Sequence, residues 1–236
     1  YFTVEVKPTI TASKQHIGAF SGGDVLFDWT EFEVPKGSAR LVGATILVRP
    51  QGNAAPTVNN KVMNLVISKS NTQTLGVINT AATNRPSNDL IGNIAFATTD
   101  FANAHMASTA VASSPTTISA PIVLTADQNV TSTQGYDKFY IGGLSDAQDF
   151  STINRINGDP DGMGTALVID GISMNALEHF LPGDVFHAHD DAVIGTAAVV
   201  ANGTITLTEA IAASVLADDD FVYNIHPIRI ILQFEQ

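Results

Sequence analysis

Apolar and polar residues alternate along much of the chain, with the period of two that is typical of half-buried β-strands. The pattern is clearest in the first and last segments, where Phe2, Val4 and Val6 share one face, as do the apolar residues from Ile228 to Phe234. Further strands are predicted at residues 25–34, 40–50, 62–70, 137–144 and 165–172. Both termini are therefore expected to lie in a sheet.

The middle of the chain is less regular. Ser87-Asn88-Asp89 is predicted to cap a short helix that carries Leu90, Ile91, Ile94 and Phe96. Residues 104–121 are small and polar, which is typical of a long surface loop or arm. The pairs Gly22-Gly23 and Gly142-Gly143 are predicted to form turns.

Short apolar segments recur about every ten residues toward the C-terminus, a spacing that indicates a small β-barrel or sandwich. A Pro182-Gly183-Asp184 turn precedes a strand through His189, and Asn202-Gly203 is a favoured hairpin dipeptide between VIGTAAVV and TITLT. Residues 209–217 have the composition of one or two helical turns, and FVYNI returns to a strand.

The predicted fold is mainly β, with few short helices. We expect an antiparallel sandwich or jelly-roll-like body at residues 1–172 and a small barrel-like subdomain at 173–226. Residues 227–236 form the closing strand. If that strand rejoins the body sheet, the subdomain is an insertion rather than an appendage.

Charge excludes several classes of partner. Only 14% of the residues are charged, well below the roughly 25% of ordinary soluble domains, and the formal net charge is −12. With 11 Lys and Arg in total, the chain has no basic stripe for nucleic acid or an anionic membrane surface. It has no cysteine and no apolar run of about 18 residues, so we expect neither disulfides nor a membrane span.

Histidines and aspartates cluster in FLPGDVFHAHDD, where His187 and His189 precede Asp190 and Asp191, with His179 just upstream. On a strand the two imidazoles would share a face, as in the metal site of a cupin-type barrel. The cupin pattern also requires a Glu near positions 193 and 194, which are Val and Ile, and a later His, but there is none between residues 190 and 225. Exposed polar residues are therefore the favoured interpretation, and a cupin-like metalloenzyme is a remote alternative.

A second candidate metal site is the turn NGDPDG, where Asn157, Asp159 and Asp161 match the first ligands of a calcium loop. The bidentate Glu of such a loop is replaced by Val168, which favours a pair of plain turns. No nucleophile elbow or phosphate-binding glycine pattern is present in the sequence. We therefore expect no catalytic residue, no cofactor and no metal.

The C-terminal third resembles virion structural proteins of tailed phages, in particular T4-like phages of marine cyanobacteria and other marine bacteria. The resemblance is carried by five segments: Pro182-Gly183-Asp184, residues 190–195, residues 205–208, residues 218–224 and the closing residues 227–235. The N-terminal segments VEVKPTITAS and VLFDWTEFEVPKGSARLVGATILVRPQG are similar to the same group. These motifs are turns and strand ends, and none of them implies a catalytic residue.

The resemblance implies a non-enzymatic building block of the virion, assembled in the host cytoplasm. The favoured role is a decoration or cement protein on the capsid surface that binds the major capsid protein. We expect the chain to self-associate, with a trimer as the first hypothesis. A neck or tail component and a carbohydrate- or receptor-binding β-module are the alternatives.

Overall fold

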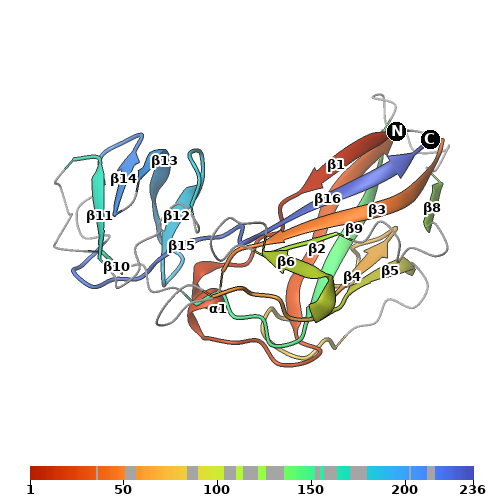
Figure 1. Cartoon of the computed structure of the whole chain (residues 1–236), viewed down its shortest axis with the longest axis horizontal. Helices are drawn as coiled ribbons and strands as arrows, with labels where there is room; N and C mark the ends of the chain where they lie inside the picture. Colours follow the sequence, from red (N-terminus) through yellow and green to blue (C-terminus); the bar gives the residue numbers. More distant parts are fainter. Residues whose placement is uncertain are drawn as a thin grey trace.

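The computed structural model describes residues 1–35, 37–50, 57–83, 90–103, 110–113, 122–125, 136–151, 155–156, 164–170, 180–201, 203–211 and 216–236. Its named strands form three sheets, and all of their pairings are antiparallel. Two sheets form one end of the elongated molecule and the third forms the other end (Figure 1). Within the described ranges, no helix is long and apolar enough to cross a membrane.

The first sheet contains both ends of the chain. Its order is β1 (Phe2–Val6), β16 (Ile228–Glu235), β3 (Ser38–Val48), β7 (Ala110–Ser113) and β6 (Phe101–Asn103), and β8 (Ile122–Thr125) also pairs with β3. The closing strand β16 thus lies between the first strand and β3. Its alternate residues Ile228, Ile230, Leu232 and Phe234 are buried, as the sequence pattern predicts.

The second sheet has the order β2 (Val25–Pro35), β9 (Tyr136–Ser145), β4 (Met63–Ser68) and β5 (Leu90–Phe96). It packs against the first sheet around one hydrophobic core. The ring of Phe32 in β2 lies 6.0 Å from Phe139 and 6.4 Å from Phe234, which belongs to the opposite sheet. The two sheets form an antiparallel sandwich, here called the body.

The helix predicted after Asp89 is wrong, because residues 90–96 form strand β5. Ile94 and Phe96 are both buried, and the segment pairs with β4 from Met63 to Ser68. Gly92 and Asn93 are poor helix formers, and pairing with a buried neighbouring strand outweighs the helical spacing of the apolar residues. The helices that are described are α1 (Ala12–His16), which the pattern did not predict, and the 3₁₀ turn η1 (Thr98–Asp100).

The turn predicted at Gly142-Gly143 is also wrong. Both glycines lie inside β9, where Gly142 pairs with Val66 and Gly143 with Leu65. A Cβ atom on Gly143 would lie 2.3 Å from the ring of Phe27. The missing side chain therefore makes room for an aromatic ring across the strand, which is a packing role rather than a turn.

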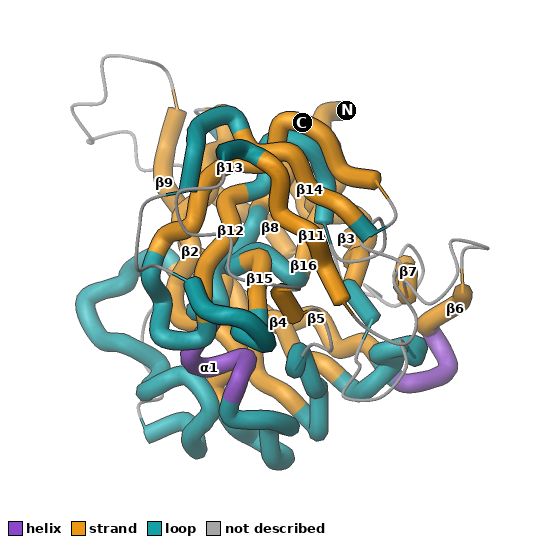
Figure 2. Tube along the Cα trace, turned by 90° about the vertical axis from the view of Figure 1, so that its left-hand side faces the viewer, coloured by secondary structure: helices purple, strands orange, loops and turns teal. Residues whose placement is uncertain are grey.

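The third sheet has the order β10 (Arg155–Ile156), β11 (Ala166–Asp170), β14 (Thr204–Leu207), β13 (Val193–Ala201), β12 (Val185–Ala188) and β15 (Val222–Asn224). A bridge between Arg155 and Phe221 brings its two edges together, so the sheet is a nearly closed barrel. It encloses a separate core that includes Phe186, Ile205 and Val222. Figure 2 shows this barrel in front of the body.

The predicted fold class is confirmed: an antiparallel body, a small barrel-like sheet near the C-terminus and few helices. Strands β10 and β11 precede residue 173 in the chain, and both pair within the barrel-like sheet. We call the part from β10 to β15 the barrel unit. Because β16 follows it and pairs with β1 and β3, the barrel unit is an insertion between two strands of the body.

Candidate functional site

The histidine and aspartate cluster lies where the barrel unit meets helix α1 of the body. The carboxylate of Asp191 accepts two hydrogen bonds from Ser13 in α1, one from the backbone N–H at 2.8 Å and one from the hydroxyl at 2.6 Å. Asp191 has a φ of 73°, a left-handed conformation that Asp tolerates better than most residues. Its place in the turn therefore serves the contact between the two units.

The two histidines of the HxH pattern have different neighbours. Strand β12 ends at Ala188, so His189 lies beyond it, contrary to the predicted extent of the strand. His187 is half-buried, and its Nδ1 lies 3.1 Å from the backbone oxygen of Asp191. His189 is exposed, and its ring centroid lies 5.2 Å from that of His16.

His16 belongs to this cluster, although the sequence analysis did not select it. It lies in α1, its Nδ1 is 2.8 Å from the hydroxyl of Tyr223, and its ring lies 5.3 Å from that of Phe221. A residue so distant in sequence from the barrel unit gives no local signal. Only the packing of α1 on β15 brings it to the other aromatic rings.

The described residues contain no group of three or more His, Cys, Asp or Glu side chains that could hold a metal ion. Asn157, Asp159 and Asp161 of the possible calcium loop, and His179, lie outside the described residues. The prediction of plain turns in this segment and the calcium alternative are therefore both untested.

The Pro-Gly-Asp turn makes a second contact between the units. Asp184 Oδ2 accepts a hydrogen bond from the backbone N–H of Leu181 at 2.8 Å, which closes the turn, and Gly183 has a φ of 91°. The same oxygen accepts a 2.7 Å hydrogen bond from Nη2 of Arg49, which directly follows β3 in the body. The Arg49 and Asp184 side chains are only 15% and 19% exposed, so this ion pair is largely shielded from water.

Burial lowers the pKa of Arg49, and the charge of Asp184 opposes this effect without cancelling it. The free-energy cost of burying the charged guanidinium is therefore larger than the stabilisation it receives from the Asp184 carboxylate.

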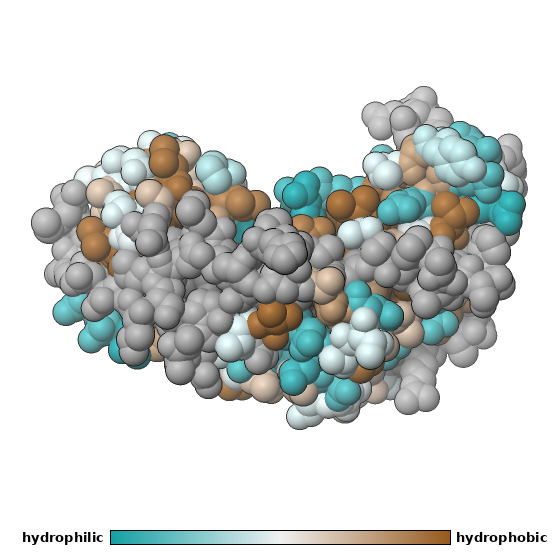
Figure 3. Space-filling view, in the orientation of Figure 1, coloured by the Kyte–Doolittle hydropathy of each residue, from teal (hydrophilic) through white to brown (hydrophobic). Residues whose placement is uncertain are grey.

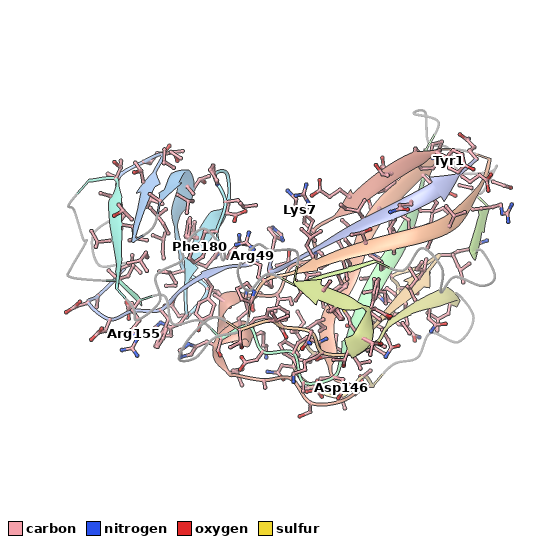
Figure 4. The ribbon with its side chains drawn as sticks, viewed as in Figure 1. Tyr1, Lys7, Arg49, Asp146, Arg155 and Phe180 are labelled. Atoms are coloured by element: carbon pink, nitrogen blue, oxygen red, sulfur yellow. The ribbon has the colours of Figure 1, made fainter. Side chains whose placement is uncertain are left out.

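A small cavity, partly open to solvent, lies beside this ion pair and has enclosed room for about one water molecule. Figure 4 shows Arg49 and Phe180 close together at the junction. The cavity is lined by residues of both units: Gln15, Arg49, Pro50, Phe150, Phe180, Val222, Tyr223, Asn224 and Pro227. Gln15 crosses the junction, because its Nε2 donates to the backbone oxygens of Ile10 at 2.7 Å and Asn224 at 2.8 Å.

Other polar residues of the C-terminal motifs are used in local turns. Asp190 accepts from the N–H of Ala192 at 3.1 Å, and Asp220 accepts from the N–H of Ala217 at 2.8 Å. Such side-chain to backbone bonds are typical of turn-forming aspartates. The arrangement fixes the shape of the loops.

The surface of the barrel unit carries several large apolar side chains that are substantially exposed. Val168, Leu181, Val193 and Val199 are 44%, 50%, 61% and 55% exposed. Figure 3 shows apolar residues on this unit and a hollow in the outline between it and the body. Searches against protein-family models, curated proteins and solved structures found no match to this chain.

Proposed function

We propose that the chain is a non-enzymatic structural protein of a tailed-phage virion, and specifically a capsid-surface decoration or cement protein. One observation supports it above the others. The aspartates of the motifs that resemble phage virion proteins hold turns together or join the two units, as Asp184 and Asp191 do. These contacts are structural, which suits a building block of a particle.

The surface properties also support this role. A net charge of −12 makes particles that carry many copies of the chain repel one another. Because only 14% of the residues are charged, much of the surface is neutral and polar, which suits contacts with neighbouring virion proteins. Four large apolar side chains on the barrel unit are substantially exposed, and exposed apolar side chains are candidates for contact with a partner. We expect some of them to contact the capsid lattice or another copy of the chain, with a trimer as the first hypothesis.

The decisive experiment locates the protein in purified particles and counts its copies by quantitative mass spectrometry. A decoration protein is present in hundreds of copies, and purified protein rebinds saturably to capsids from which it has been removed. Tens of copies or fewer per particle would indicate a component of the neck or tail instead. Absence from purified particles would refute the proposal.

Two equally exposed valines provide a matched pair of variants for the binding assay. Val193 on the barrel unit is 61% exposed and Val77 on the body is 60% exposed. We expect Val193→Asp to weaken capsid binding and Val77→Asp to leave it unchanged, with light scattering to follow self-association in both. Equal binding by the two variants would exclude Val193 from the contact.

A further inference from the structure

One histidine from each unit lies at the contact between the body and the barrel unit. His16 in α1 and His189 after β12 have ring centroids 5.2 Å apart, and their ring planes are inclined by 45°, so this is not a face-to-face stack. Both residues are exposed. Metal–nitrogen bonds of about 2.0–2.1 Å place the ring centroids of two imidazoles on one tetrahedral ion about 5 Å apart. The spacing of the pair therefore fits two ligands of one metal ion.

Each of the two rings has a nitrogen available for an ion. In His16, Nδ1 lies 2.8 Å from the hydroxyl of Tyr223, which leaves Nε2 for a metal. Metal-bound histidines commonly hold their second nitrogen in such a hydrogen bond, because it fixes the tautomer and the orientation of the ring. The ring of His189 makes no hydrogen bond to the described residues, so it can turn about its Cβ–Cγ bond toward an ion.

His187, the other histidine of the H-x-H pattern, is not available to form a site with His189. Its Nδ1 lies 3.1 Å from the backbone oxygen of Asp191, and its Nε2 is buried without a partner in the described part of the chain. One nitrogen is thus occupied and the other is shielded from solvent. The structure therefore gives His189 a different partner, His16, from the one considered in the sequence.

We propose that His16 and His189 bind one divalent transition-metal ion such as Zn²⁺, with water at the remaining coordination positions. Imidazole ligands suit zinc, nickel and copper, whereas magnesium and calcium prefer oxygen. Two protein ligands are fewer than the three or four of most zinc sites, so the site is open and its affinity is modest. The net charge of −12 raises the local concentration of cations. Because the two ligands belong to different units, the bound ion links α1 to the turn after β12.

The test is a titration of the folded full chain with zinc sulfate in a buffer that does not bind metals, followed by calorimetry and by NMR of the histidine ring nitrogens. We expect the ring signals of His16 and His189 to change together and to saturate, while those of His187 stay constant and magnesium sulfate has no effect. Hydrogen exchange in α1 should slow, because the ion joins α1 to the barrel unit. A titration without saturable change at these rings, or with change at His189 but not at His16, would overturn the proposal.

Replacement by phenylalanine separates metal binding from ring packing. His16→Phe keeps an aromatic ring beside Phe221, whose centroid lies 5.3 Å from that of His16, but it has no ligating nitrogen. Loss of a second-shell partner alone costs about 10–100-fold in metal affinity, so His16→Phe and His189→Phe should each weaken zinc binding at least about tenfold. His187→Asn is the matched control, because its amide can still donate to the backbone oxygen of Asp191 and zinc affinity should not change. Wild-type affinity in either phenylalanine variant would overturn the assignment, and a loss in His187→Asn alone would indicate the H-x-H site instead.

Discussion

Replacing Asp184 with asparagine should destabilise the junction by about 2–3 kcal/mol. The change removes the charge from a side chain that accepts a 2.7 Å hydrogen bond from Arg49, while the amide oxygen can still accept from Leu181 and keep the turn closed. Hydrogen bonds to charged groups contribute about 1.5–3 kcal/mol, and breaking a fully buried ion pair costs about 3–5 kcal/mol. With 15% and 19% of the two side chains exposed, the expected value lies toward the upper end of the first range.

The assay is urea unfolding at pH 7, with hydrogen exchange to assign the loss to the barrel unit and α1. Glu5→Gln is the matched control, because it removes the same charge from an ion pair with Arg229 in which the side chains are 38% and 44% exposed. Exposed pairs of this kind contribute at most about 1 kcal/mol. If Asp184→Asn costs no more than Glu5→Gln, the shielded ion pair does not stabilise the junction as argued.

Three further predictions concern the body, the barrel core and pH. Gly143→Ala should lower the free energy of unfolding in denaturant by about 1–3 kcal/mol, because the new methyl group meets Phe27. The same change at Gly22 should cost much less, because the closest contact there is a flexible side-chain oxygen at 3.1 Å. Equal losses for the two variants would refute the packing role of Gly143. Phe186→Ala should lower the free energy of unfolding by about 3–5 kcal/mol. It should remove hydrogen-exchange protection from β11–β15 while β2 and β9 stay protected, because the body has its own core. A uniform loss of protection across the chain would contradict two separate cores. The pKa of Glu5 is lowered from 4.5, chiefly by its hydrogen bond from an arginine, so its contribution is complete above about pH 4.5 and is lost below it. The difference in unfolding free energy between wild type and Glu5→Gln should therefore shrink between pH 7 and pH 3, and a constant difference would be inconsistent with the ion pair.

The sequence predicts the strands that have one buried face. In β16 the alternation from Ile228 to Phe234 corresponds directly to burial, because both neighbouring strands lie in the same sheet and one face meets the core. The prediction fails at residues 90–96, where the apolar spacing also fits a helix and only the pairing with β4 decides. It fails at Gly142-Gly143 for a similar reason, since the ring of Phe27 that needs the space comes from another strand.

The candidate site was only partly predictable. His187, His189, Asp190 and Asp191 are close together in sequence, and the structure places them at the end of β12 and in the turn that follows it. Ser13, the partner of Asp191, and His16, beside His189, come from the body, as does Arg49, the partner of Asp184. No local pattern marks these partners. The contact between the barrel unit and the body depends on where the chain leaves the body and where it returns to it.

The position of β16 also sets the order in which the body can form during synthesis. Strand β1 leaves the ribosome before the other described strands, yet its partner in the sheet is β16, in register from Phe2 with Phe234 to Val6 with Ile230. Until residues near 235 emerge, β1 has no described neighbour in its sheet and one side of β3 is left open for pairing. Contacts so far apart in sequence are slow to form, and open strand edges invite association between chains. The barrel unit, whose strands are close in sequence, can fold first, whereas the open edges of β1 and β3 are covered only when β16 pairs with them.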